Sequence, residues 1–339
     1  MLTPATKTAQ AVKPKLGFLG VGWIGRNRLE AISKCGKSSI VAICDASEKS
    51  ALQAAGDIEN CKVISTYHEL INSDVDGVVI ATPSAKHAEQ VRIALQHGKA
   101  VFVQKPLALD AASSRELVAL AQKHNCLLKV DFSYRYTRAL KAVKEVIDSG
   151  EIGEIFSADL IFHNAYGPDK EWYYDVTKSG GGCLTDLGIH LIDLLYWLQP
   201  DACVASHFCR LYKNGRAISG SDRVVEDFAV ADLIMNNALN AHIACSWNLN
   251  AGKEAVIEVS FYGTKGGVQF KNINGSFYDF EANLLKGTET IPLENSSDDW
   301  GGRAGVEWAE QLSRGNSFDP TNTEYINVAE TLDLLYGNP

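Results

Sequence analysis

Short apolar runs alternate with amphipathic stretches between residues 15 and 130, and this alternation constrains the fold more than any other feature of the chain. The stretches between the runs have helical spacing, at residues 24–34, 85–96 and 111–124, and Asp110 is placed to cap the last of them. Apolar strands separated by helices form a parallel sheet covered on both faces, because parallel strands need crossover connections. We therefore predict a doubly wound α/β domain with strands at residues 16–19, 39–44, 77–81, 100–103 and 126–130.

After residue 136, longer strand candidates follow one another with little helix between them. Turn-forming residues at 236–237 and 263–266 join neighbouring candidates, which is typical of an antiparallel sheet in an α+β domain. Helices predicted at 304–313 and 324–335 can pack on either domain. At roughly 100–200 residues per domain, a chain of 339 residues has room for two. We predict a loose tail at 1–14, the doubly wound domain at 15–131 and the α+β domain at 132–339, with strands at residues 155–163, 224–235, 238–247, 255–262 and 267–270.

The composition excludes several classes of partner. Lys and Arg total 32 against 41 Asp and Glu, so the chain has a formal charge of −9 and repels nucleic-acid phosphates and anionic membrane surfaces. Its apolar runs are far shorter than the ~20 residues of a membrane-spanning helix. The first fourteen residues lack the apolar segment of an export signal, so we expect a cytoplasmic protein. The eight cysteines form no Cys-x-x-Cys pair, which favours reduced thiols over disulfides or zinc ligands.

A glycine-rich turn follows the first predicted strand, with the sequence Gly20-Val21-Gly22-Trp23-Ile24-Gly25. Side chains at Gly20 or Gly22 would obstruct the tight turn and a diphosphate held at the N-terminus of the following helix. Asp45 ends the second strand, where a carboxylate can accept hydrogen bonds from an adenosine ribose. The same carboxylate would repel a 2′-phosphate, so the motif predicts NAD as the cofactor in preference to NADP. The alternative is a strand-to-helix turn with a coincidental aspartate.

Gln104, Lys105 and Pro106 follow the strand predicted at residues 100–103. In a doubly wound sheet the ligand crevice lies at the carboxyl ends of the strands, so Lys105 is placed beside a bound nicotinamide. A lysine there can take part in acid–base chemistry or polarise a hydroxyl. The structural alternative for such a Lys-Pro pair is a surface turn.

Asp186, His190 and Asp193 occupy positions i, i+4 and i+7 of an apolar-periodic helix that follows three glycines at 180–182. This spacing puts the three side chains on one helical face. A carboxylate one turn from a histidine can orient the imidazole and favour its protonated form, which outlines an acid–base unit. Two alternatives are a polar helix face with a satisfied histidine and, more rarely, a metal site. The chain offers no obvious further ligand, so we expect no metal.

Residues 164–174 combine aromatic and polar side chains just before those glycines, and Tyr166, Trp172 and Tyr174 are among them. The CH faces of a sugar stack on aromatic rings while its hydroxyls take hydrogen bonds, so this segment suits a sugar substrate. A packed loop or a contact between subunits explains the same composition equally well.

Two further motifs complete the pattern: Ala81-Thr82-Pro83-Ser84 followed by His87, and Tyr134-Arg135-Tyr136. Together with the glycine-rich turn, Gln104-Lys105-Pro106 and the run from Gly180 to His190, they resemble the glucose-fructose oxidoreductase, inositol dehydrogenase and MocA family (Gfo/Idh/MocA). The resemblance covers almost the whole chain. It implies an N-terminal Rossmann domain followed by a domain with a large open-faced, mostly antiparallel sheet.

The motifs and the resemblance together define three groups of expected site residues. The catalytic residues are Lys105, Asp186 and His190. The cofactor-binding residues are Gly20, Gly22, Trp23, Ile24, Gly25, Asp45, Thr82, Pro83, Ser84, His87, Gln104 and Lys105. The substrate-binding residues are Arg135, Tyr166, Trp172, Tyr174, Asp186 and His190. One departure matters, because the family usually has Glu where this chain has Gln104: Gln can still hydrogen-bond a nicotinamide ribose hydroxyl, but it removes a negative charge beside Lys105.

We expect an NAD-dependent oxidoreductase that moves a hydride between nicotinamide and a secondary alcohol of a sugar, sugar derivative or cyclitol. Two alternatives stay open within the family: a glycosidase that retains its NAD through a redox-neutral oxidation and elimination cycle, and a non-catalytic nucleotide-sensing regulator. The presence of both Lys105 and His190 argues against the regulator, which needs no acid–base pair. The resemblance also implies a homodimer or homotetramer.

Overall fold

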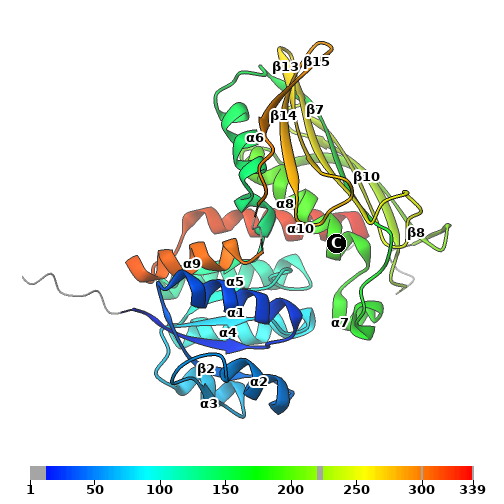
Figure 1. The fold of residues 1–339 in the computed structure, drawn as a ribbon. Helices are drawn as coiled ribbons and strands as arrows, with labels where there is room; N and C mark the ends of the chain where they lie inside the picture. The colour runs from blue at the N-terminus through cyan, green and yellow to red at the C-terminus, as the bar shows by residue number, and fades with distance from the viewer. Residues whose placement is uncertain (1–12, 220–223, 299–300, 338–339) are drawn as a thin grey trace, which may run out of the picture.

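The structure is a computed structural model that describes residues 13–219, 224–298 and 301–337. The predicted tail at 1–14 therefore lies almost wholly outside the described residues. Figure 1 shows an α/β unit in blue and cyan beneath a large twisted sheet in green to orange, with the C-terminal helices at their junction.

The N-terminal sheet is parallel in every pairing and has the strand order β3-β2-β1-β4-β5-β6. The order reverses beside β1, which opens a crevice at the carboxyl ends of β1 and β4. The predicted doubly wound domain is confirmed. Its strands are β1 (Lys15–Leu19), β2 (Ser39–Cys44), β3 (Lys62–Val63), β4 (Gly77–Ile80), β5 (Ala100–Val103) and β6 (Leu128–Val130), and its helices are α1 (Trp23–Cys35), α2 (Glu48–Ala55), α3 (Tyr67–Asn72), α4 (His87–Gln96) and α5 (Ala111–His124).

Apolar side chains leave both faces of this sheet, so both faces are packed. In β1, Phe18 joins a cluster with Ile32 of α1, whereas the next residue, Leu19, joins the cluster on the opposite face. This alternation is what a parallel strand covered on two sides requires. The predicted cap of α5 is also present, because Asp110 Oδ1 accepts a hydrogen bond from the Ser113 amide at 2.7 Å.

The second sheet contains nine strands among the described residues, in the order β15-β14-β13-β12-β7-β11-β10-β8-β9. Its pairings are antiparallel except that of β7 with β11, so the mostly antiparallel sheet is confirmed. The pattern did not predict β8, β9, β14 or β15; β8 and β15 are largely exposed and have little apolar periodicity. The strands are β7 (Ile155–Asn164), β8 (Val204–Lys213), β9 (Arg216–Ile218), β10 (Phe228–Met235), β11 (Asn240–Ser246), β12 (Ala255–Gly263), β13 (Gly266–Asn272), β14 (Phe280–Lys286) and β15 (Glu289–Glu294).

The helices of the second half connect the two sheets. Helices α6 (Arg138–Asp148) and α8 (Ile189–Leu198) pack on the second sheet, while α10 (Glu324–Tyr336) contacts both α5 and α8. Helix α9 (Arg303–Arg314) instead returns to α1 and β5, where Trp308 is fully buried. Helix α9 therefore packs into the core of the N-terminal domain, although it follows the second sheet in the sequence. The domain boundaries and the predicted homodimer or homotetramer stay predictions.

Three further observations concern the cysteines, metal binding and membrane-spanning helices. All eight cysteines are free thiols. Within residues 13–219, 224–298 and 301–337, no group of three His, Cys, Asp or Glu side chains is arranged to hold a metal ion. In the same ranges, none of the helices combines the length and the apolar character that a membrane span requires.

Candidate active site

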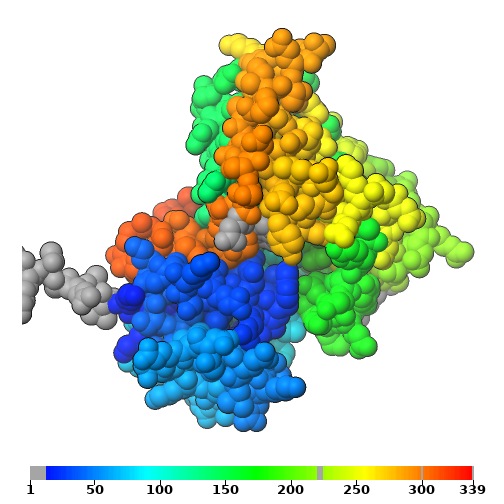
Figure 2. All heavy atoms as spheres, in the orientation of Figure 1, coloured from blue at the N-terminus to red at the C-terminus, as the bar shows by residue number. Residues whose placement is uncertain are grey.

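A cavity of about 500 Å³ lies where the carboxyl ends of β4, β5 and β6 meet helix α8 and the segment after β7. That segment includes the short helix α7 (Val176–Ser179), which contacts the turn at Ser84–Lys86. Figures 1 and 2 show it, in green, beside the blue N-terminal unit. The predicted site residues that line the cavity are Trp23, Ile24, Thr82, Gln104, Lys105, Tyr166, Trp172, Asp186 and His190.

Lys105 and Asp186 form an ion pair in this cavity. The Lys105 ammonium donates to Asp186 Oδ1 at 2.6 Å and to the Asp186 carbonyl oxygen at 2.7 Å. The second carboxylate oxygen of Asp186 accepts a hydrogen bond from Trp247 Nε1 at 3.1 Å. Both partners of the ion pair keep about a sixth of their side-chain surface exposed, 16% and 17%. Asp186 therefore orients Lys105, while its predicted role in orienting His190 stays a prediction.

The backbone around Asp186 departs from a regular α-helix. Residues Leu184–Gly188 form a π-helical turn, after which the chain continues as α8. A π turn closes hydrogen bonds from i to i+5, so Asp186 and His190 are not related as in a regular α-helix, although both still line the cavity. The buried Glu226 carboxylate fixes the start of the turn, because it accepts the amides of Gly182 and Leu184, each at 2.9 Å. A Cβ at Gly182 would collide with the Glu226 carbonyl, so only glycine fits there.

His190 lies in an aromatic environment at the wall of the cavity. Its ring centroid is 5.1 Å from that of Tyr134 and 6.2 Å from that of Phe132. Burial, helped by the nearby positive charges of Lys105 and Arg28, holds the pKa of His190 well below its usual value. The expected protonated imidazole is therefore a neutral one, which is the form that accepts a proton.

Two polar atoms at the cavity lack partners within the described residues. They are Nδ1 of His190 and Oδ1 of Asn164, the last residue of β7, and both atoms are buried. A buried polar atom without a hydrogen bond costs free energy, and such atoms point to a missing ligand or to a catalytic role. Asn164 was not singled out in the sequence, where only its position at the start of the aromatic segment marked it.

Arg135 and Asp193 do not belong to this cavity. The Arg135 guanidinium binds the Asp193 carboxylate at 2.5 and 2.9 Å and Glu324 at 2.6 Å, on the far side of Phe132. Asp193, three residues after His190 in α8, therefore binds Arg135 and does not line the cavity, and neither does Arg135, which was predicted to bind substrate.

The glycine-rich turn fits the diphosphate of a dinucleotide. Gly20 has φ +90°, and a Cβ there would lie 2.5 Å from the Ala81 carbonyl oxygen. Gly22 begins α1 with no side-chain cap, and among the described residues no atom lies within 4 Å of where its Cβ would be. The N-terminus of α1 thus faces open space, as an anion site requires. Asp45 is held at the end of β2 by the amides of Val21 and Ser47, at 2.7 and 2.8 Å.

Several predicted cofactor residues do not line the cavity. His87 is buried, and its two ring nitrogens lie 2.7 and 2.8 Å from the carbonyl oxygens of Pro106 and Thr82. It thereby ties the loop after β4 to the loop after β5. The other predicted cofactor residues outside the cavity lining are Gly20, Gly22, Gly25, Asp45, Pro83 and Ser84.

The aromatic segment contributes three rings to the cavity, those of Tyr166, Trp172 and Tyr173. Trp172 and Tyr173 stack with centroids 3.9 Å apart. Tyr174 points elsewhere, packs against Trp247 and donates its hydroxyl hydrogen to the Pro168 carbonyl at 3.0 Å. Tyr173 therefore lines the cavity in place of Tyr174, and the sequence pattern does not distinguish these two neighbours in a short 3₁₀ turn.

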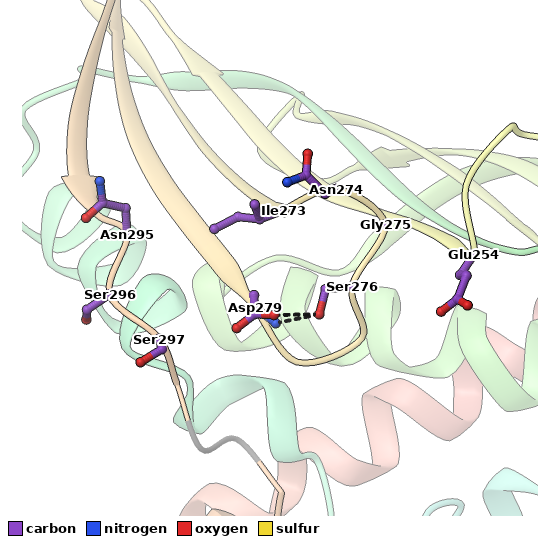
Figure 3. A pocket seen from close by; sticks show the side chains of 9 residues that line it. All are labelled: Glu254, Ile273, Asn274, Gly275, Ser276, Asp279, Asn295, Ser296 and Ser297. Atoms are coloured by element: carbon purple, nitrogen blue, oxygen red, sulfur yellow. Dashed lines mark hydrogen bonds between the residues drawn. The ribbon is translucent and has the colours of Figure 1, made fainter.

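A second pocket, of about 490 Å³, lies next to the segment that carries Phe277 and Tyr278 (Figure 3). Figure 3 shows Ser276 and Asp279 bonded to each other in one loop, with Glu254 and Asn295 on the neighbouring segments. Ser276 Oγ donates to Asp279 Oδ2 at 2.8 Å. Among the described residues this pocket has no lysine, histidine or cysteine in its lining, so it offers no acid–base pair.

Comparison with known proteins identifies both parts of the chain. Residues 15–132 match the model of the oxidoreductase family with an NAD-binding Rossmann fold, and residues 140–269 match that of the GFO/IDH/MocA C-terminal domain. The inositol 2-dehydrogenase of Rhizobium meliloti (strain 1021) is 28% identical over 262 residues, which are 77% of this chain and 73% of that protein.

Solved structures share the fold. GenD2 from gentamicin A biosynthesis, in complex with NAD, has a TM-score of 0.80 and 23% identity and covers 99% of this chain and 97% of its own. Levoglucosan dehydrogenase, in complex with NADH and L-sorbose, has a TM-score of 0.80 and 20% identity, with 96% of each chain covered. The two family matches together span most of the chain, and the protein belongs to the Gfo/Idh/MocA family of NAD-binding oxidoreductases.

Proposed function

We propose that the protein is an NAD-dependent dehydrogenase or reductase of a secondary alcohol on a sugar, sugar derivative or cyclitol. The observation that carries this proposal is the pair of buried, unpartnered atoms in the cavity, His190 Nδ1 and Asn164 Oδ1, beside the Lys105 ammonium. A polyol offers several adjacent hydroxyls, which suit a lining with more than one polar side chain. The aromatic rings of Tyr166 and Trp172 suit the CH faces of such a ligand. The names of the relatives, which include an inositol and a levoglucosan dehydrogenase, agree with this substrate class.

The chain's own groups divide the proton chemistry. In the oxidising direction the neutral His190 imidazole takes the proton of the substrate hydroxyl. Lys105 uses two of its three N–H donors on Asp186 and has one left for the reacting oxygen. Asp186 holds the ammonium in place, and Trp247 holds Asp186. NAD, when bound, supplies the hydride acceptor at nicotinamide C4, and NADH supplies the donor for the reverse reaction.

We further propose that NAD is preferred over NADP. The Asp45 carboxylate is fixed by two backbone amides at the end of β2, where it would meet a 2′-phosphate with like charge. A specificity constant higher with NADP than with NAD would contradict this assignment.

The test is a panel of inositols, aldoses, anhydrosugars, aminosugars and nucleotide sugars incubated with NAD, with NADH formation followed by absorbance. We expect stoichiometric NADH with at least one polyol, and a rate of NADH formation lower by ~10²–10⁴ with His190→Ala. Glu254→Gln, in the pocket of Figure 3, is the matched control and should leave turnover unchanged. Release of a glycosidic substituent without net NADH would favour the NAD-retaining glycosidase, and NAD binding without any turnover would favour a regulator.

A further inference from the structure

A closed network of charged and polar side chains lies under the nicotinamide end of the proposed cofactor site. Arg28 of α1 donates from Nε to Asp131 Oδ2 at 2.6 Å and from Nη2 to Ser133 Oγ at 2.9 Å. Ser133 Oγ donates in turn to Asp131 Oδ1 at 2.6 Å. Arg28 and Asp131 are 3% and 2% exposed, so this ion pair is essentially withdrawn from water. The fourth member is Gln104, whose Nε2 donates to Asp131 Oδ2.

The partner of Gln104 determines which way its amide faces. A carboxylate only accepts hydrogen bonds, so the NH₂ group of Gln104 must lie on the side of Asp131. The carbonyl oxygen Oε1 is then turned away from Asp131, and no described residue donates a hydrogen bond to it. Gln104 lines the cavity next to Lys105, so this oxygen is a preset acceptor beside the proposed nicotinamide site.

We propose that Asp131, supported by Arg28, is a positioning residue that fixes the Gln104 amide so that Oε1 accepts a hydrogen bond from the nicotinamide riboside of NAD. This inference rests on the proposed function only in requiring that NAD lies beside Lys105. It also accounts for the departure from the family's usual Glu. A glutamate at 104 would place a second carboxylate against Asp131, whereas glutamine keeps an acceptor toward the cofactor and gives Asp131 a donor.

The network also connects the two ends of the cofactor site. Arg28 lies on α1, whose N-terminus faces the proposed diphosphate position, whereas Gln104 and Asp131 follow β5 and β6. The buried ion pair between α1 and the end of β6 therefore holds the acceptor at 104 in a fixed place relative to the diphosphate site. Such a preformed arrangement reduces what must be ordered when the dinucleotide binds.

The experiment measures the Kd of NADH by calorimetry, without substrate, together with the melting temperature of each variant. Gln104→Met removes the Oε1 acceptor together with the Nε2 donor to Asp131, whereas Arg28 and Ser133 still bond that carboxylate, so we expect NADH binding to weaken by roughly five- to tenfold with little change in melting temperature. Gln104→Glu opposes two carboxylates and should weaken binding by at least about tenfold. Gln104→Glu/Asp131→Asn again leaves one carboxylate beside Arg28, so the opposed charges are removed and the Kd should return to within about threefold of the natural protein.

The matched control is Gln269→Glu. Gln269 Nε2 donates to Glu258 Oε1 at 2.8 Å between β13 and β12, so this change opposes two carboxylates in the same way far from the cavity. It should leave the Kd of NADH unchanged. A double variant no better than Gln104→Glu would show that Asp131 does not orient residue 104, and unchanged affinity in Gln104→Met would remove the acceptor role. Either result overturns the inference. Because no substrate is present, a failure of the proposed alcohol chemistry would not affect these measurements.

Discussion

Two ion pairs join the loops after neighbouring strands of the first sheet to one helical segment, yet they have different chemical capacities. Lys105–Asp186 opens onto the cavity, and its ammonium keeps one donor unused by Asp186. In Arg135–Asp193 the carboxylate is closed off: the side chain of Asp193 is 1% exposed, and Glu324 binds the third guanidinium nitrogen of Arg135. The comparison shows that residue type and spacing do not define a catalytic pair. A catalytic pair is defined by its access to the cavity and by the hydrogen-bond donors that its partner does not use.

The largest expected effect comes from removing the proposed acid–base groups at the Lys105–Asp186 pair, which opens onto the cavity. General acid–base groups typically contribute ~10²–10⁴ in rate, so His190→Ala and Lys105→Met should each lower kcat by about that factor. NADH affinity should fall far less in His190→Ala, because the glycine turn and Asp45 are untouched. Turnover numbers and NADH titrations on purified variants measure this.

The double variant sharpens the same prediction. Two groups that act on one proton transfer are not additive, so His190→Ala/Lys105→Met should lose much less than the product of the single losses. A His190→Ala enzyme that retains most of its turnover on the true substrate would show that the histidine is structural, and would move the acid–base role to Lys105.

Breaking the Arg135–Asp193 pair should lower the free energy of unfolding and leave kcat nearly unchanged. Arg135→Met leaves the buried Asp193 carboxylate without its main partner, and breaking a buried pair in this way costs about 3–5 kcal/mol of unfolding free energy. The protein that remains folded should keep a kcat close to that of the natural enzyme. Chemical denaturation and active-site titration of the folded fraction separate the two quantities; a large loss of kcat at unchanged stability would place Arg135 in the reaction.

The two pairs also show what the sequence could and could not predict. The alternation of strands and helices suffices for the parallel sheet, and the motif positions bring Lys105, Asp186 and His190 to one cavity. The π turn at Leu184–Gly188 could not be predicted, because it depends on Glu226, more than 40 residues later, accepting the amides of Gly182 and Leu184. The sequence also could not show that Asp193, three residues after His190 in α8, would be bound by Arg135 outside the cavity.

An effect of intermediate size is expected in the pH dependence of kcat/KM. Burial and the charge of Lys105 lower the pKa of His190, so the base stays neutral and kcat/KM should not fall as pH decreases through about 6.5, the usual histidine pKa. Removing the charge in Lys105→Met should raise that pKa and move the acid limb of the profile to higher pH, whereas Arg135→Met should leave the limb in place. Profiles of kcat/KM for the three proteins test this, and an acid limb near 6.5 in the natural enzyme would contradict the neutral buried base.

The smallest expected effect concerns the aromatic wall of the cavity onto which the Lys105–Asp186 pair opens. Trp172 lines the cavity and stacks on Tyr173, and an aromatic contact contributes about 0.5–1.5 kcal/mol beyond burial. Trp172→Ala should therefore raise the KM for the polyol by roughly three- to tenfold, with little change in kcat or in NAD affinity. Phe208→Ala removes an exposed ring of β8 that lies outside the cavity lining, and it should change none of these constants. If Trp172→Ala instead lowers the melting temperature sharply while the folded protein binds substrate normally, the aromatic segment is a packed loop and the substrate contacts lie deeper, at Asn164 and His190.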